Sequence, residues 1–595
     1  LDDLGTDKEI PIKQYLNRVW VMKAISLKII AFLAQIEDFQ KKLFEKKKFV
    51  LKSEYCMTLD QVPESLYPEI VANIAQIKEW KALYSIGEST GQATLADSRG
   101  TVFDLEFLKS HPYLVLDTKF FPQEFKDRLL ASFDDLDDAI GGLMVKSENW
   151  QALNLLQERY REQVKCIYID PPYNTGSDEF LYKDDYQHSS WLMMMYDRIN
   201  LSKNLMNENS SFYCQVDFNE SNRLRILLDS LLIYQREIIW SNESASGFKG
   251  QADNWIRGHD NIFYYSHSEK PDFIKQFLEL TEATKRRYDK TDPVTGEKYK
   301  EYFEDDGTVR KVFLSQSKGK PLSTVWTDII SFQTVNASRE HVGFDTQKPT
   351  SLISRIIKAS NVMSNNFCLD FFAGSGTTAH SILNLNREDN GNRKYILIEI
   401  ADYFDTVMKP RIQKVVYSSE WKEGKPQNTD GFSHIFKYLV LEQYEDTLNN
   451  IEFKEAGTVQ KTLMDMEGYL LRYMLDFETR ESPCRVNVAK LDRPFEYSLR
   501  ITRDNQLHNE TVDLVETFNY LLGLKIKRIR TFKENGTTYR VVHGETLAGQ
   551  PTTVIWRTTV GLDLKKDKKY IEETLLKDPK LKAERIYLNG DFHVE

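Results

Sequence analysis

Residues 164–173 read VKCIYIDPPY, a mostly apolar run that ends in an acid, two prolines and an aromatic ring. A short apolar run that stops at prolines is typical of a buried strand leading into a turn. Prolines fix φ and carry no N–H, so nearby carbonyls can accept hydrogen bonds while the Tyr173 ring offers a π-face. The corner made by Asp170, Pro171, Pro172 and Tyr173 therefore suits an unstacked base that carries an exocyclic amine.

A second strand and turn follow at residues 367–378, FCLDFFAGSGTT, where an apolar run leads into glycines and then a helical stretch. Glycines at such a point let the backbone turn tightly and approach a ligand closely. The next parallel strand is expected at residues 394–399, KYILIE, and it ends in Glu399, which can hold ribose hydroxyls. These features predict a nucleoside site.

The glycine turn also has a competing interpretation. Residues 374–379, GSGTTA, fit the dinucleotide fingerprint G-x-G-x-x-A, and a lone match of this kind is weak. A nicotinamide-dependent oxidoreductase would need a hydride-transfer site, and binding of the reduced cofactor would support it. The combination with residues 170–173 favours the other interpretation, because both elements would meet at the carboxyl edge of one parallel sheet.

The order of these motifs resembles that of the DNA amino-methyltransferases that use S-adenosylmethionine, in the β-ordered group. DPPYNTG at residues 170–176 matches the catalytic motif of the adenine-N6 enzymes, and DFFAGSGT at residues 370–377 matches the cofactor motif. TQKP at residues 346–349 resembles the third conserved element, which lines the methionine end of the cofactor. The resemblance implies an S-adenosylmethionine enzyme that flips adenine out of the duplex and methylates N6 by direct transfer.

The candidate site residues follow from these motifs. The catalytic set is Asp170, Pro171, Pro172 and Tyr173. The cofactor-binding set is Gln347, Lys348, Pro349, Asp370, Phe371, Phe372, Ala373, Gly374, Ser375, Gly376, Thr377 and Glu399. We expect no metal.

Three further segments resemble the modification subunit of type III restriction-modification systems: LNLLQ at 153–157, WLMMMY at 191–196 and VDLVETFNYLLGL at 512–524. This resemblance covers roughly residues 110–595. It implies double-stranded DNA as substrate, a homodimer, and a separate helicase–nuclease restriction subunit. An orphan adenine methylase without a nuclease partner fits the sequence equally well. Cytosine-N4 methylation uses the same amine chemistry, and here the resemblance favours adenine, because the cytosine enzymes more often carry Ser in place of Asp170. The chain has no G-x-x-x-x-G-K-[ST] phosphate loop that would indicate a motor.

The expected fold class is α/β, with a Rossmann-like methyltransferase core and a mostly parallel sheet. The expected domains are a helical N-terminal region (1–110), the catalytic half of the core (111–268), a target-recognition insertion (269–345), the cofactor half (346–418) and an α+β C-terminal assembly or partner domain (419–595). An inner strand is expected at 211–216. A later strand at 259–265 brings aromatic residues that either stack on the flipped base or pack in the core.

In the N-terminal region, apolar residues at three-four spacing predict a helix–helix seam inside one subunit: Ile29, Phe32, Ile36, Phe39 and Leu43. The alternative is a short intermolecular coiled coil, for which the stripe spans fewer than three heptads. The longest apolar stretch, around residues 29–34, is interpreted as far short of a bilayer span. With no signal peptide recognised, we expect a cytoplasmic protein without a membrane partner.

Composition sets further bounds. A chain of 595 residues is too long for one core. Its five cysteines are scattered without a C-x-x-C pair, which predicts small buried hydrophobes in a reducing compartment. The net charge of −10 argues mildly against nucleic-acid binding, so a DNA enzyme of this composition needs a local basic cleft. Candidate basic stretches lie at 285–287, 318–320 and 525–530.

Overall fold

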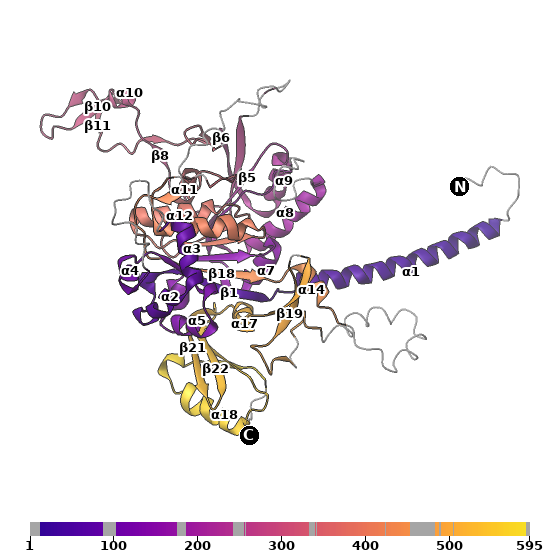
Figure 1. The fold of residues 1–595 in the computed structure, drawn as a ribbon. Coiled ribbons are helices and arrows are strands. Elements are labelled where there is room, and N and C mark those ends of the chain that lie inside the picture. The colour runs from indigo at the N-terminus through magenta and orange to yellow at the C-terminus, as the bar shows by residue number, and fades with distance from the viewer. Residues whose placement is uncertain are drawn as a thin grey trace.

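The computed structural model describes residues 12–86, 103–174, 186–241, 255, 258–332, 340, 342–344, 346–422, 424–452, 482–486, 490–503 and 505–590. These residues surround one large sheet, from which a long helix, a narrow arm and a C-terminal domain extend in different directions (Figure 1).

The large sheet has eleven strands. In spatial order they are β13 (Val325–Trp326), β6 (Ile233–Ser241), β7 (His259–Ser266), β5 (Met206–Val216), β4 (Val164–Ile169), β14 (Phe367–Asp370), β15 (Lys394–Glu399), β3 (Gly142–Lys146), β18 (Ile435–Leu441), β1 (Val50–Thr58) and β2 (Val115–Asp117). The six strands from β5 to β18 run parallel to their neighbours. The prediction of an α/β core with a mostly parallel sheet is therefore confirmed.

Helices cover both faces of this sheet. One core forms around Cys166 and Tyr168 of β4 with the helices α11 (Thr350–Ala359), α12 (Thr377–Asp389) and α13 (Lys409–Tyr417). The other forms around Ile167 and Ile169 with α7 (Asn149–Tyr160), α8 (His188–Lys203) and α9 (Ser221–Leu231). Because successive side chains of a strand point to opposite faces, a strand covered on both sides is buried along its whole length. This explains why all six residues of β4 and of β15 are buried.

The N-terminal stretch supplies strands as well as helices. Its helices are α1 (Ile12–Glu45), α2 (Tyr67–Ala72), α3 (Ile74–Tyr84) and α4 (Leu105–Ser110), followed by α5 (Gln123–Leu130) and α6 (Leu136–Ala139). Between α1 and α2, β1 pairs antiparallel with β18 and β2 and extends the large sheet. A helical description of residues 1–110 therefore omits a sheet strand, because its pairing with residues almost four hundred positions away leaves no local signal.

The long helix α1 projects from the body (Figure 1). Of the expected seam, Phe39 and Leu43 are buried, whereas Ile29 and Phe32 are exposed. By length and composition, Gln14–Glu45 qualifies as a helix that can cross a membrane. The expectation that the longest apolar stretch falls far short of a bilayer span was therefore wrong.

The arm and the C-terminal part are built from short elements. The arm contains β8 (Phe277–Leu278), α10 (Glu282–Lys285), β9 (Lys290–Thr291), β10 (Lys298–Phe303), β11 (Val309–Phe313) and β12 (Lys320–Pro321). The C-terminal part contains β16 (Trp421–Lys422), β17 (Lys425–Pro426), α14 (Tyr444–Asn449), β19 (Ser498–Arg503), β20 (Gln506–Thr511), α17 (Leu514–Leu522), β21 (Lys525–Glu534), β22 (Thr537–Glu545), β23 (Pro551–Arg557), α18 (Leu564–Tyr570) and β24 (Arg585–Leu588). The domain boundaries drawn from the sequence stay a prediction.

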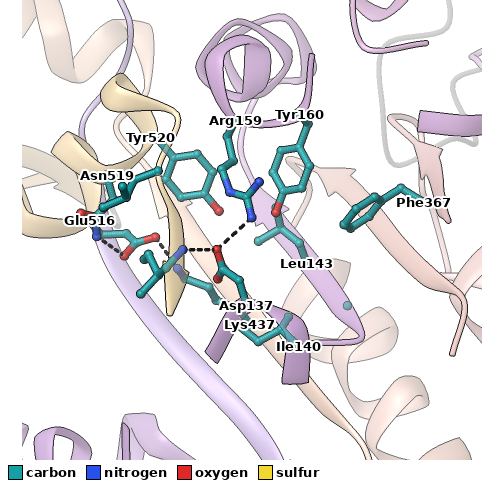
Figure 2. A pocket seen from close by; sticks show the side chains of 13 residues that line it. Asp137, Ile140, Leu143, Arg159, Tyr160, Phe367, Lys437, Glu516, Asn519 and Tyr520 are labelled. Atoms are coloured by element: carbon teal, nitrogen blue, oxygen red, sulfur yellow. Dashed lines mark hydrogen bonds and ion pairs between the residues drawn. The ribbon is translucent and has the colours of Figure 1, made fainter. Parts of the chain in front are cut away.

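Buried charges attach α17 to the large sheet. Lys437 on β18 forms an ion pair with Glu516 on α17, and the two residues are only 2% and 3% exposed. Beside them Arg159 binds Asp137 at 2.9 Å, and Asp137 also accepts the backbone N–H of Ile526 at 2.8 Å. Figure 2 shows these side chains converging from the sheet, from α7 and from α17. The cluster ties the C-terminal part to the amino end of the parallel strands.

This cluster yields a stability prediction. Lys437→Met leaves the Glu516 carboxylate buried without its cation, which should cost about 3–5 kcal/mol. The double variant Lys437→Met/Glu516→Leu removes both charges and should recover most of that loss. Urea unfolding followed by tryptophan fluorescence measures the shift in midpoint.

The matched control is Lys109→Met, which removes the cation of the exposed pair with Glu64 and should cost less than about 1 kcal/mol. Additive losses in the double variant would contradict the account of a buried, interdependent pair.

Candidate functional site

A cavity of about 480 Å³ opens at the carboxyl edge of the parallel strands. Most of the candidate residues line it: Asp170, Pro172, Lys348, Asp370, Phe371, Phe372, Ala373, Gly374, Ser375, Thr377 and Glu399. The remaining candidates, which do not line the cavity, are Pro171, Tyr173, Gln347, Pro349 and Gly376. The structure thus brings the end of β4 and the turn after β14 to one cavity, as the sequence predicted for parallel neighbours.

The glycine turn after β14 leads directly into α12. Gly374 and Gly376 have positive φ angles of 51° and 79°, which glycine adopts without strain. A Cβ on Gly376 would lie 2.8 Å from the Met408 side chain. Glycine is therefore required here both for the backbone conformation and for close packing against Met408, which immediately precedes α13.

Glu399, at the end of β15, braces this turn. One carboxylate oxygen accepts the backbone N–H of Gly374 at 3.0 Å, and the other accepts the N–H groups of Ile400 and Ala401 at 2.9 and 3.1 Å. The carboxylate also lines the cavity. Its position is compatible with the predicted role in holding hydroxyls.

Asp370, at the end of β14, is only 3% exposed. It accepts the Thr378 hydroxyl at 2.6 Å and the backbone N–H of Phe372 at 3.1 Å. Burial raises the pKa of Asp370 to about 7 and also raises the pKa of Glu399. Two carboxyl groups whose pKa burial has raised thus face one cavity, and a cationic ligand would favour their ionised forms.

The corner at the end of β4 is held by hydrogen bonds. Tyr173 donates its hydroxyl to one oxygen of Asp170 at 2.7 Å, and the Lys348 ammonium pairs with the other oxygen. Trp191 on α8 donates its indole N–H to the carbonyl of Pro172 at 2.8 Å. Burial raises the pKa of Asp170, although Lys348 acts in the opposite direction. Lys348, assigned to the cofactor from the sequence, therefore contacts the catalytic acid in this structure.

One contributor was missed by sequence reasoning. Arg411 on α13 donates from one guanidinium nitrogen to the carbonyl of Ser375 at 3.1 Å, to its hydroxyl at 2.9 Å and to the Thr377 hydroxyl at 3.0 Å. Burial lowers the pKa of Arg411 to about 10. This guanidinium holds the glycine turn in place through Ser375 and Thr377, and it does not itself line the cavity. No local pattern distinguishes it from the other cations of its helix.

Asn149, at the start of α7, was also missed. It donates its side-chain amide to the carbonyl of Phe371 at 3.0 Å and accepts from Arg198. Both residues line the cavity together with Glu148, which forms an ion pair with Arg198. The side of the cavity opposite α12 is therefore polar and already hydrogen-bonded.

The aromatic residues of β7 pack in the cores. Phe263 and Tyr265 are buried, and Tyr264 stacks on Tyr213 with ring centroids 4.6 Å apart. Of the two predicted uses for these rings, the structure shows core packing. Within the described ranges, no group of three or more His, Cys, Asp or Glu side chains is arranged to hold a metal ion.

The residues around this site are similar in sequence to known proteins. Residues 164–409 match the family model described as DNA methylase. The chain is 26% identical over 415 residues to the type III restriction-modification enzyme StyLTI Mod subunit of Salmonella typhimurium, covering 53% of this chain and 63% of that protein. It is 23% identical to the probable HindVI Mod subunit of Haemophilus influenzae, covering 63% of each. The chain thus spans a little under two thirds of the length of these relatives.

The class of protein that the fold and site are most similar to is the DNA methylases, whose family model matches residues 164–409. More narrowly, the chain is a relative of the type III modification subunits, as its motifs predicted. A solved complex of M1.HpyAVI with SAM aligns at a TM-score of 0.30 and 14% identity, over 46% of this chain and 98% of that one. That likeness is too low to support a conclusion.

The raised pKa of Asp370 predicts a pH effect on stability. Because the folded-state pKa of about 7 exceeds the usual Asp value near 3.9, ionising Asp370 opposes folding. The favourable contribution of Asp370 to the free energy of unfolding is fully present below about pH 4 and is lost as the pH rises toward 7. Between pH 5 and 8 the ligand-free wild type should lose on the order of 3 kcal/mol relative to Asp370→Asn.

Urea unfolding midpoints of the wild type and of Asp370→Asn between pH 5 and 8 measure this difference. The contributions of the other titrating groups largely cancel, because both proteins contain them. Parallel pH profiles would contradict the raised pKa of Asp370.

Proposed function

We propose that this protein is a site-specific DNA methyltransferase that moves the methyl group of S-adenosylmethionine to N6 of adenine. The observation that carries the proposal is the meeting of Asp170 with Asp370 and Glu399 at one cavity. An amine-accepting corner and a nucleoside-type turn are both needed for such a transfer, and here they lie on adjacent parallel strands.

The residues present fit the cofactor. S-adenosylmethionine carries a sulfonium and an ammonium, and the cavity presents carboxyl groups whose pKa burial has raised. A bound cation favours the ionised form of such groups. In this proposal Glu399 holds the ribose, the turn from Asp370 to Thr377 surrounds the nucleoside and methionine parts, and residues 347–349 flank the methionine end. When bound, the cofactor supplies an already activated methyl group.

Asp170 prepares the acceptor amine. The lone pair of adenine N6 is delocalised into the ring, so the amine is a poor nucleophile. By accepting N6 hydrogens, Asp170 and the Pro171 carbonyl favour a tetrahedral nitrogen whose lone pair faces the methyl group. As the new N–C bond forms and the S–C bond breaks, the amine gives up a proton to Asp170 or to water.

An adenine that enters the site must change the hydrogen bonds that Asp170 makes in this structure. Tyr173 and Lys348 now donate to its two oxygens. An incoming N6–H must replace or share one of these donors, and the Tyr173 ring can then stack on the base. Lys348 in this proposal balances the charge of Asp170 while the base is absent. It also lowers the pKa of Asp170, against the larger effect of burial.

The projecting arm supports the proposed DNA contact. In the β10–β11 pair, Tyr302 lies opposite Arg310, and Lys300 lies on the same face two residues from Tyr302. The Arg310 guanidinium is 5.7 Å from the Tyr302 ring centre. These two strands extend beyond the short third strand of their sheet, β9, and a ribbon of two antiparallel strands fits the major groove of DNA. We therefore assign target recognition to the insertion at residues 269–345.

The proposed assembly follows the type III resemblance. It comprises a homodimer of this chain acting on double-stranded DNA in the cytoplasm, together with a separate helicase–nuclease restriction subunit. An orphan methylase without that subunit remains the alternative. Inspection of the adjacent reading frame distinguishes the two.

The catalytic assignment is tested with Asp170→Ala. This variant should lower methyl transfer to duplex DNA by about 10²–10⁴-fold, the usual contribution of a positioned acid–base group, while cofactor binding stays intact. Incorporation of labelled methyl groups and calorimetric titration of S-adenosylmethionine measure the two properties.

The matched control is Glu388→Ala, which removes an exposed carboxylate of α12 that pairs with Lys358 and should leave both properties unchanged. Undiminished methylation by Asp170→Ala would sink the assignment.

The cofactor assignment is tested with Glu399→Gln. Loss of a charge-assisted hydrogen bond costs about 1.5–3 kcal/mol, so S-adenosylmethionine should bind roughly 10- to 100-fold more weakly. Transfer at saturating cofactor should be much less affected. Glu388→Gln serves as the control. Unchanged cofactor affinity in Glu399→Gln would remove this residue from the cofactor site.

A further inference from the structure

The outer part of α1 exposes apolar side chains on a scale unusual for a protein surface. Trp20 and Met22 are each 66% exposed, and Ile30 is 60% exposed. Eleven large apolar residues between Leu16 and Leu33 are more than two fifths exposed. Single-chain soluble proteins rarely expose contiguous apolar patches above a few hundred Å². This surface therefore needs a partner.

A regular seam runs along this helix. Its members alternate at spacings of three and four over three heptads, the pattern of coiled-coil a and d positions: Met22, Ile25, Ile29, Phe32, Ile36, Phe39 and Leu43. The inner end is covered by the protein itself, since Phe39 and Leu43 are 8% and 2% exposed. The four outer members, Met22, Ile25, Ile29 and Phe32, are exposed. The seam thus continues beyond the point where its own subunit covers it.

The base of α1 is firmly attached. The Gln151 side chain donates to the Phe44 carbonyl at 3.0 Å, and the Asn154 side chain donates to the Glu45 carbonyl at 2.8 Å. The Phe44 ring lies 4.8 Å from the Trp150 ring. These contacts with α7 set the direction in which the outer part leaves the body (Figure 1). The apolar seam is therefore presented outward on a fixed base.

The exposed area suits a dimer. The four outer seam residues and the flanking Val21 and Leu33 are between 41% and 66% exposed. Together they provide on the order of 600 Å² of apolar surface per copy, which is about what the smaller specific interfaces bury per partner. Between Met22 and Phe32 the seam carries no charged residue, because Lys28 falls at a flanking g position and Lys23 at a b position that points away from the seam. Arg18 falls at the d position of the preceding heptad, before the seam begins. Two copies can therefore meet along it without burying a charge.

The same charges disfavour a membrane as occupant. Arg18, Lys23 and Lys28 are five residues apart, which places them about 140° apart around the helix. Every side of the outer helix therefore carries a cation. Each such residue costs about 2.5–3.5 kcal/mol at the centre of a bilayer.

We propose that α1 is a dimerisation helix, which pairs along its Met22–Phe32 seam with the same segment of a second copy of this chain. This inference deepens the homodimer part of the proposed function by naming the interface. It does not depend on methyl transfer, because it rests on α1 alone.

The test compares two double variants in the full chain. Ile25→Glu/Ile29→Glu places two charges in the seam, and the matched control Leu27→Glu/Ala34→Glu places two charges on the opposite face of the same helix. Each buried carboxylate costs well over 1 kcal/mol, so the seam variant should weaken association by at least roughly 100-fold. Sedimentation velocity over a concentration series measures the mass.

The expected result is a dimer for the wild type and for the control variant, with a monomer for the seam variant at the same concentration. The proposal is overturned by a monomeric wild type at micromolar concentration, by a dimeric seam variant, or by equal disruption in both variants. Wild-type monomers that float with phosphatidylcholine–phosphatidylglycerol vesicles would identify a membrane helix and also overturn it.

Two controls separate this result from the proposed catalytic function. Far-UV circular dichroism should be the same for all three proteins, because every substituted side chain is exposed. The sedimentation result does not depend on cofactor or DNA binding. If the protein fails to methylate DNA, the mass measurement still decides the role of α1.

Discussion

The adjacency of two parallel strands, β4 and β14, is the constraint on which this molecule's chemistry depends. In the register of β4 against β14, Cys166 lies opposite Cys368 and Ile167 lies opposite Leu369. Two segments two hundred residues apart therefore end at the same edge of the sheet. Asp170 and Asp370 follow these strands and therefore face one cavity. The helices on both faces bury the two strands, and this burial removes freedom to shift the register.

Burial then determines the electrostatics of the cavity. The ends of β4, β14 and β15 each carry a carboxyl group whose pKa is raised because water is largely excluded. Glu399 accepts hydrogen bonds from backbone N–H groups, and Asp370 accepts them from a hydroxyl and a backbone N–H. Asp170 forms an ion pair with a lysine. The cavity is thus hydrogen-bonded before any ligand enters, yet it retains a preference for positive charge. That preference matches a sulfonium nucleoside better than the anionic pyrophosphate of a nicotinamide dinucleotide.

Local sequence patterns predicted the elements that carry the site, because those elements are locally specified. Continuous apolar runs at 164–169 and 394–399 are typical of strands buried on both faces, and glycines with positive φ marked the turn after β14. Long-range contacts were not predictable. The pairing of β1 with β18, the Arg411 contact behind the glycine turn and the Lys348–Asp170 ion pair all join distant segments. The prediction that the apolar seam of α1 packs inside one subunit holds for Phe39 and Leu43, which are buried. It does not hold for Ile29 and Phe32, which are exposed.

The central claim is that Asp170 presents the amine of adenine to a methyl donor held by the neighbouring strand. It is tested most directly by incubating duplex DNA with isotopically labelled S-adenosylmethionine and the purified protein. The DNA is then digested to nucleosides, and the labelled species is identified by mass spectrometry. This account predicts labelled N6-methyladenine. Labelled N4-methylcytosine, or no labelled nucleoside despite bound cofactor and DNA, would contradict it.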